Sequence, residues 1–147
     1  MKTLNPPTLM LICAFSMITL HLVMPLWPIS SWIFLILGIG FILMGMVLGF
    51  AAEGQFTRSG TTVDPFGMPT KLVTDGWFKN SRNPMYLSFA LMLTGAWLAL
   101  GSASPLLVVV AYLLLAERWY ILPEEKRLTA TFGKVYEDYQ KRTRRWL

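Results

Sequence analysis

Two long apolar stretches dominate the pattern of the chain. After Lys2 the next charged residue is Glu53, and a second uncharged stretch separates Arg82 from Glu117. A charge at the centre of a bilayer helix costs roughly 2.5 to 3.5 kcal/mol on insertion scales, so uncharged stretches of this length are typical of membrane segments. About 20 apolar residues cross a bilayer. Each stretch is therefore long enough for two membrane-spanning helices.

A turn divides each stretch. Pro25 and Pro28 bracket the first turn, and a segment from Gly101 to Pro105 forms the second. No convincing small-residue cleavage site follows the first apolar run, so we expect an uncleaved anchor rather than a signal peptide. The sequence predicts an all-α integral membrane protein with one domain over residues 1–147. Its four transmembrane helices, in two hairpins, are expected at residues 8–24, 31–52, 84–100 and 105–122.

Two polar segments complete the predicted fold. Residues 53–81 contain several glycines, prolines and aromatic residues, which favours a cytoplasmic loop folded over a site at the membrane surface. Over residues 123–142, apolar side chains recur at helical spacing opposite charged ones. This pattern predicts a C-terminal amphipathic helix, lying at the interface or packed on the bundle.

The glycines of the second predicted helix share one face. Gly45 and Gly49 follow Gly38 at spacings that bring all three to the same side at 3.6 residues per turn. Small residues in this arrangement let two membrane helices approach closely. We therefore favour a packing role for them over a ligand role.

Composition and charge narrow the class of protein. The chain is 54% hydrophobic, with a net charge of +5 and one cysteine, so an ordinary soluble domain, a disordered chain and an intrachain disulfide are excluded. In the four-helix topology all lysines and arginines lie on one side, which the positive-inside rule makes cytoplasmic. Both termini are expected there. The lipid bilayer is the expected partner, and nucleic acid is not.

The residues that could carry chemistry cluster at the charged side. His21, the single histidine, lies near the opposite end of its helix and is interpreted as structural, and no residue pattern suits a metal. The second hairpin brings the segment around Arg82 close to Glu117 and Arg118, which need partners such as Arg82 or Glu53. Simple snorkelling at the interface would also explain these charges.

The same segments have structural explanations. Asn83 before Pro84 suits a helix N-cap, and Glu124 with Glu125 complements the positive end of the last helix.

Several motifs resemble the isoprenylcysteine carboxyl methyltransferase and phospholipid methyltransferase superfamily. The resemblance covers about residues 60–147 and includes bacterial-type features at Gly60 to Pro65 and at Thr74-Asp75-Gly76. Its other parts are Arg82-Asn83-Pro84-Met85-Tyr86, Gly95, Gly101-Ser102, Glu124-Glu125, Leu128, Phe132-Gly133, Tyr136 and Tyr139.

This resemblance implies an integral-membrane methyltransferase, expected in a bacterial inner membrane, that uses S-adenosyl-L-methionine and releases S-adenosyl-L-homocysteine. The implied cofactor site lies between the start of the third helix, the end of the fourth and the C-terminal helix. A sulfonium and an ammonium favour carboxylates, and the carboxylate of the cofactor suits an arginine or helix amides. The implied cofactor-binding residues are Asn83, Pro84, Tyr86, Glu124, Glu125, Leu128, Tyr136 and Tyr139. The candidate catalytic residues are Arg82, Glu117 and Arg118.

Asn83 replaces the histidine that is common in the superfamily, so no obvious base is available. A carboxyl group with a pKa of about 4 is already ionised at pH 7 and needs none. The expected acceptor is therefore a lipophilic small molecule or prenylated substrate, with a prenylcysteine-like or other hydrophobic carboxylate favoured over a phospholipid amine or a thiol. A sterol-reductase-like enzyme using NADPH and a small multidrug-type transporter remain alternatives.

Overall fold

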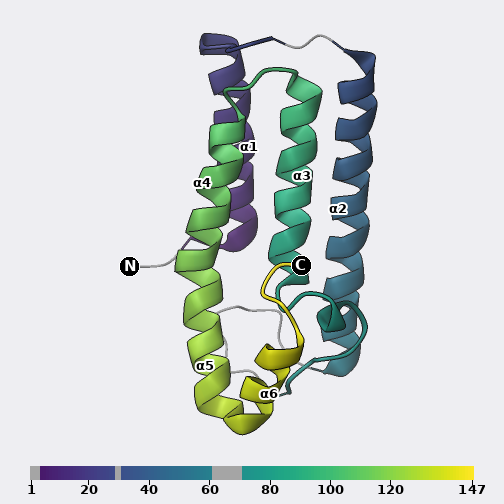
Figure 1. The fold of residues 1–147 in the computed structure, drawn as a ribbon, viewed down its shortest axis with the longest axis vertical. Coiled ribbons are helices and arrows are strands. Elements are labelled where there is room, and N and C mark those ends of the chain that lie inside the picture. The colour runs from purple at the N-terminus through teal and green to yellow at the C-terminus, as the bar shows by residue number, and fades with distance from the viewer. Residues whose placement is uncertain (1–3, 29–30, 61–70) are drawn as a thin grey trace.

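The computed structural model describes residues 4–28, 31–60 and 71–147, and within these ranges the chain is helical with no strand (Figure 1). The elements are α1 (Pro6–Val23), α2 (Trp32–Ser59), the short 3-10 helix η1 (Gly76–Lys79), α3 (Pro84–Leu100), α4 (Leu106–Ala116), the π-helical segment η2 (Glu117–Ile121), α5 (Leu122–Phe132) and α6 (Lys134–Arg142). The predicted all-helical class is confirmed for this part of the chain.

α3 is the central helix of the bundle. Figure 1 shows it between α2 on one side and α1 with α4 on the other. Every residue from Ser81 to Pro105 is buried or half-buried. The outward faces of the surrounding helices are apolar and exposed, with Phe15, Val47 and Leu114 as examples. Such a surface is stable in lipid rather than in water, because the hydrocarbon of a bilayer surrounds apolar side chains without any further protein to cover them.

Three helical stretches are long and apolar enough to cross a membrane. They are α1, α2 and the continuous helix from Leu106 to Phe132, while α3 is apolar and 17 residues long. The protein is therefore an integral membrane protein, with three to four helices that can span the bilayer.

Glycines bring α2 and α3 into backbone contact. A Cβ atom on Gly38 would lie 2.6 Å from the carbonyl oxygen of Gly95, and one on Gly45 would lie 2.6 Å from the carbonyl oxygen of Ser88. Gly49 also faces the Ser88 side chain. The predicted packing role of the glycine face is confirmed.

α2 is longer than the sequence predicted. The expected helix ended at residue 52 because Glu53 is the first charge, but α2 continues to Ser59 and Gly60 ends it in a left-handed conformation with φ of 68°. Charged and polar residues do not break a helix once it leaves the membrane, whereas glycine at the C-cap does. The predicted loop 53–81 therefore begins seven residues too early, and residues 61–70 lie outside the described residues.

The fourth helix does not end near residue 122. α4 continues through η2 into α5 as one helical rod, so the predicted boundary between a helix ending at residue 122 and a separate helix starting at residue 123 is wrong. Proline removes one backbone donor and crowds the carbonyl four residues earlier. The wider π-helical turn over Glu117–Ile121 lies just before it, and such turns adjust helix hydrogen bonding locally.

The predicted amphipathic helix over residues 123–142 is two helices. Gly133, with φ of 52°, separates α5 from α6, and α6 turns back toward α3 (Figure 1). Its buried residues Tyr136 and Tyr139 form a second core with Ala52, Val73 and Phe78. This core joins the end of α2, the segment around η1, and α6.

Candidate active site

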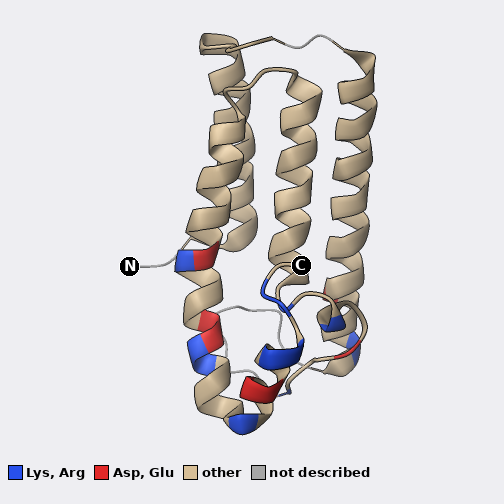
Figure 2. Ribbon diagram, viewed as in Figure 1, with Lys and Arg blue, Asp and Glu red and all other residues tan. Residues whose placement is uncertain are grey.

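Charged residues gather at one end of the molecule. Figure 2 shows lysine, arginine, aspartate and glutamate of the described residues on the lower part of the bundle, with none on the upper part. The start of α3, the η2–α5 rod, α6 and the C-terminal tail 143–147 all meet there. The sequence-predicted site residues lie on these elements.

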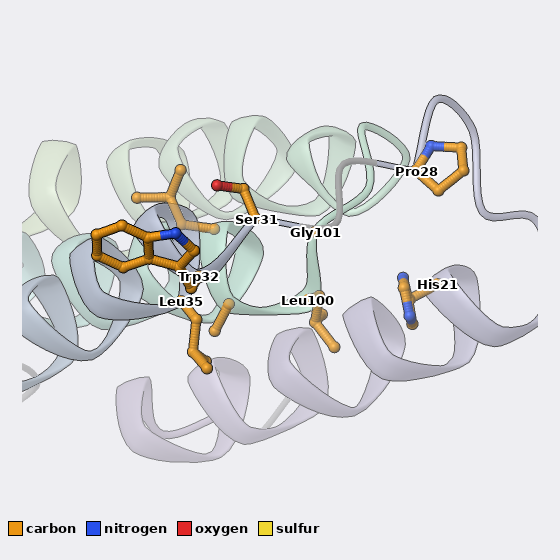
Figure 3. Close-up of a pocket in the computed structure, with 9 residues that line it drawn as sticks. His21, Pro28, Ser31, Trp32, Leu35, Leu100 and Gly101 are labelled. Carbon is orange, nitrogen blue, oxygen red and sulfur yellow. The ribbon is translucent and has the colours of Figure 1, made fainter.

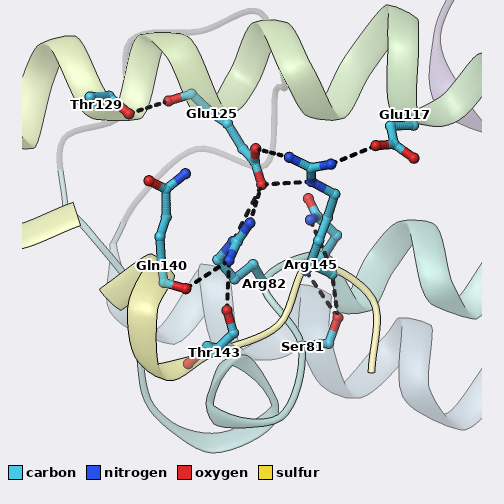
Figure 4. Close-up of polar contacts among 9 residues, drawn as sticks. Ser81, Arg82, Glu117, Glu125, Thr129, Gln140, Thr143 and Arg145 are labelled. Atoms are coloured by element: carbon cyan, nitrogen blue, oxygen red, sulfur yellow. Dashed lines mark hydrogen bonds and ion pairs between the residues drawn. The ribbon is translucent and has the colours of Figure 1, made fainter. Parts of the chain in front are cut away.

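Glu125 lies between two arginines. Arg82 Nη2 donates to Glu125 Oε1 over 2.7 Å, and Arg145 Nη2 donates to Glu125 Oε2 over 2.8 Å (Figure 4). The side chains of Glu125 and Arg82 are each only 10% exposed. A buried carboxylate needs such partners because its desolvation is costly. Glu125 is thus fully engaged in joining α5 to the start of α3 and to the tail.

Arg82 also fixes the C-terminal tail. Its Nη1 donates to the carbonyl oxygens of Thr143 over 2.6 Å and Gln140 over 3.1 Å, and its backbone amide donates to the carbonyl of Arg144. These bonds, with those to Glu125, occupy most of the guanidinium donors. Arg82 therefore holds the end of α6 against the start of α3.

The neighbouring Glu124 has a different partner. Tyr86, in the first turns of α3, donates its hydroxyl to Glu124 Oε2 over 3.2 Å. The Tyr86 ring stacks on Tyr120 with a centroid distance of 5.9 Å, and Tyr112 donates its hydroxyl to the Tyr86 carbonyl. Consecutive helical residues point about 100° apart, which is why the two adjacent glutamates reach different groups. The structure thus brings the predicted pair Tyr86 and Glu124 together.

Asn83 does not cap α3 with its side chain. The Asn83 side chain makes no capping bond, and its Nδ2 donates to the carbonyl of Arg145 over 3.0 Å. Ser81 Oγ contacts the same carbonyl and accepts from the Asn83 amide. Asn83 therefore occupies the predicted N-cap position before Pro84, but its side chain binds the tail instead of capping the helix. Pro84, as expected, is the first residue of α3 and is fully buried.

Tyr136, Tyr139 and Leu128 lie in the second core. Tyr139 donates its hydroxyl to the carbonyl of Phe78 over 2.6 Å, and its ring is 6.0 Å from that of Tyr136. Burial raises the pKa of both tyrosine hydroxyls, so they stay neutral donors. Leu128 packs against the same cluster. These residues pack α6 against η1 and the end of α2, and their predicted contact with a cofactor stays a prediction.

Glu117 and Arg118 are neighbours in the sequence but have different environments in the structure. Glu117 Oε1 accepts from Arg145 Nη1 over 2.5 Å, rather than from Arg82, the arginine that the sequence favoured. Arg118 is exposed and makes no hydrogen bond or ion pair with the described residues. Glu53 is likewise exposed. Arg118 therefore fits the snorkelling interpretation better than a catalytic one.

Sequence reasoning missed the role of Arg145. Figure 4 shows its guanidinium between Glu125 and Glu117, and these hydrogen bonds raise the pKa of Arg145 further above that of free arginine. In the sequence it is one of several basic residues in the tail, and helical periodicity ends at Arg142. Only the proximity of the tail to α3 distinguishes it from Arg142 and Arg144.

A pocket lies at the opposite end of the bundle. It has a volume of about 360 Å³ and is lined by residues that include His21, Trp32 and Leu100 (Figure 3). His21 Nδ1 is 2.8 Å from Ser102 Oγ, which links α1 to the turn after α3. The structural interpretation of His21 is thus supported. No cluster of His, Cys, Asp and Glu able to hold a metal occurs in the described part of the chain.

Comparisons with known proteins connect the chain to a protein family. A family model described as phospholipid methyltransferase matches residues 33–135, which include α3 and the glutamates of α5. An uncharacterized protein of Haemophilus influenzae is 38% identical over 63 residues, which are 43% of this chain and all of the relative. No solved structure matches.

Proposed function

Because the chain belongs to the phospholipid methyltransferase family, we propose that it is a membrane methyltransferase that takes its methyl group from S-adenosyl-L-methionine and transfers it to a lipophilic acceptor. The family implies methyl transfer and favours this activity over NADPH-dependent reduction and over transport. The proposed site lies at the charged end, facing the cytoplasm.

The contact between Tyr86 and Glu124 carries the proposal. It joins the first turns of α3 to α5, the two segments between which the cofactor is expected, at a hydroxyl–carboxylate distance of 3.2 Å. Glu125 is neutralised by Arg82 and Arg145, whereas the hydrogen bond that Glu124 accepts within the described part of the chain comes from the uncharged hydroxyl of Tyr86. Glu124 is therefore the carboxylate that would hold the ammonium or sulfonium of the cofactor.

Other groups at this end suit the remaining parts of the cofactor. The first amides of any helix lack intrahelical acceptors, so the amides after Pro84 would bind the carboxylate of the methionine moiety. Tyr136 and Tyr139 would border the adenosine. When bound, S-adenosylmethionine supplies an electrophilic methyl group. Tyr86, in this arrangement, orients Glu124 and keeps water from it.

A hydrophobic carboxylate is the acceptor that the site favours. The described residues near Asn83 offer no imidazole, and Asn83 itself is committed to the tail. A carboxylate is already ionised, so its oxygen forms the bond to the methyl carbon while the sulfur–methyl bond breaks, without proton removal. The chain then has to align the two reactants and exclude water. A prenylcysteine-like carboxylate, entering from the bilayer, satisfies these conditions.

A phospholipid amine is the second candidate, favoured by the printed description of the family. An amine has to lose a proton, and Glu124 is the carboxylate placed to accept it once Tyr86 releases its hydrogen bond. A carboxylate acceptor therefore needs Glu124 only as an anionic partner for the cofactor, whereas an amine acceptor also needs Glu124 as a base.

Titration calorimetry of the detergent-purified protein tests the cofactor site. We expect wild-type protein to bind S-adenosylhomocysteine, and Glu124→Gln to weaken binding at least tenfold, since it removes one charge-assisted contact. Glu137→Gln, on the exposed side of α6, is the matched control and should bind as wild type does. Folded wild-type protein that gives no heat with either S-adenosylmethionine or S-adenosylhomocysteine would refute the proposal.

Radiolabelled S-adenosylmethionine distinguishes the acceptors. With N-acetyl-S-farnesylcysteine as acceptor, the expected product is a methyl ester, and mild base releases its label as methanol. With phosphatidylethanolamine, the label would stay on nitrogen through base treatment. If all of the labelled product is stable to base, the acceptor is the amine and not the carboxylate.

A further inference from the structure

Arg145 has more unused guanidinium hydrogen-bond donors than Arg82. Its Nε and Nη2 donate to Glu125 and its Nη1 donates to Glu117, which uses three of the five guanidinium hydrogens. Arg82 uses four in its bonds to Glu125, Thr143 and Gln140. The Arg145 side chain is 33% exposed, against 10% for Arg82. Of the two arginines, Arg145 is the one that a ligand can reach.

The partner that Arg145 can release is Glu117. Glu117 is 34% exposed and Glu125 is 10% exposed. Partly exposed ion pairs contribute little to stability, whereas breaking a buried pair leaves a charge without compensation. An incoming anion can therefore replace Glu117 on Arg145 at low cost while Glu125 stays bound.

This exchangeable pair lies where a lipid headgroup would. Glu117 opens η2, directly after the uncharged α4, and its neighbours Arg118 and Trp119 are exposed. The change from uncharged to charged residues along the rod marks the depth of the headgroups. The Arg145 carbonyl also accepts from Asn83, which ties this position to the start of α3.

We propose that Arg145 is the specificity-determining residue that binds the anionic group of the lipid acceptor, taking it in exchange for Glu117. This inference rests on the proposed methyltransferase function and deepens it. Both candidate acceptors carry such a group, a carboxylate or a phosphodiester, and the fork of a guanidinium binds either in a bidentate manner. Arg145 lies beyond residues 33–135, so the family match does not assign this role.

Three dodecyl amphiphiles test the proposal. The full-length protein in neutral detergent, with S-adenosylhomocysteine present, is titrated with dodecanoate, dodecyl phosphate and dodecanol, which differ only in headgroup. We expect the two anions to bind at least tenfold more tightly than the alcohol. The relative affinity of the two anions shows whether a carboxylate or a phosphate group fits Arg145 better.

Variants separate recognition from a structural role. Arg145→Gln should abolish the preference for anions, Arg145→Lys should keep part of it, and Glu117→Gln should tighten anion binding about threefold or more, because the competing carboxylate is gone. Arg144→Gln, which removes the same charge from the exposed neighbouring residue, is the control and should keep the full preference. If Arg145 only held the tail in place, Glu117→Gln would weaken binding or leave it unchanged.

Wild-type protein with equal affinity for the three amphiphiles, or a Glu117→Gln variant with weaker anion binding, would overturn the proposal even if Arg145→Gln failed to fold. A separate titration of S-adenosylhomocysteine without amphiphile tests the proposed function on its own. Cofactor binding without anion preference refutes the role of Arg145 alone. Anion preference without cofactor binding refutes the methyltransferase and leaves the lipid site.

Discussion

At the residue scale, the two adjacent glutamates of α5 have opposite environments. Glu125 is buried and paired with two guanidinium groups, while Glu124 meets a tyrosine hydroxyl. The first arrangement holds the fold together, and in the proposed function the second provides the carboxylate for a cationic ligand. Substituting each glutamate should therefore separate stability from binding.

Glu125→Gln should lower stability sharply. Removing the charge leaves Arg82 buried without its anion, and breaking a buried pair in this way costs about 3 to 5 kcal/mol. The free energy of unfolding in mixed detergent and SDS micelles measures the loss. Glu137→Gln on the exposed face of α6 should change stability by less than about 0.5 kcal/mol. Equal stability of the two variants would mean that the Arg82–Glu125 pair contributes nothing.

The sequence could identify residues that the structure brings together, but it could not assign the contact that each of them makes. The resemblance identified Tyr86, Glu124 and Glu125, and helical geometry alone says that neighbouring glutamates diverge. It does not say which of them faces the arginines, because that depends on the rotation of α5 about its axis. Nor could it find Arg145, since a tail without periodicity has no predictable direction.

At the scale of elements, the close backbone contact between α2 and α3, the α2–α3 seam, depends on glycines that have no side chain. A Cβ atom on Gly95 would clash with the carbonyl oxygen of Gly38 and would lie 2.8 Å from the amide nitrogen of Ile42. Backbone atoms cannot move aside as side chains do. The two helices would have to separate to accept any larger residue.

Gly95→Ala should therefore destabilise the protein by about 1 to 3 kcal/mol, the usual cost of overpacking. Gly40→Ala on α2 is the matched control, because a Cβ atom there would have no neighbour within 4 Å. Thermal unfolding in micelles, followed by circular dichroism, compares them. A Gly95→Ala variant as stable as Gly40→Ala would show that the seam is looser than the contacts indicate.

Element types were predictable and element ends were not. Uncharged stretches fix where helices can lie in a bilayer, since exposed backbone polar groups are not tolerated in lipid. Outside the bilayer that constraint ends, and α2 runs on past Glu53 until Gly60 stops it. At Pro123 the opposite error arises. The sequence predicts two separate helices with a boundary between residues 122 and 123, whereas the π-helical turn before Pro123 allows the helix to continue.

At the scale of the whole molecule, the one-sided distribution of charge predicts the orientation. The charged end should face the cytoplasm, by the positive-inside rule, with the turn around Leu26 on the other side. Both Leu26 and Lys126 have exposed side chains, and Cys13 is buried and should not react. The orientation can therefore be read from single added cysteines.

In right-side-out vesicles, a membrane-impermeant maleimide should label Leu26→Cys at once and Lys126→Cys only after the vesicles are permeabilised. The unsubstituted protein, with Cys13 alone, is the control and should stay unlabelled. Immediate labelling of Lys126→Cys, with Leu26→Cys protected, would invert the proposed topology and put the site on the outer face.

The two turns at the uncharged end are linked to each other by polar contacts. The amide of Ala103 donates to the carbonyl of Leu26 over 2.8 Å, and His21 contacts Ser102 nearby. At the other end, the Glu117–Arg145 pair is within reach of water, which can replace its bonds when they break. At the charged end, the buried Arg82–Glu125 pair stays closed, and Glu117–Arg145 is the contact that can open without separating the helices. An entering lipid would therefore need only a local exchange of partners there, and the bundle itself would stay closed.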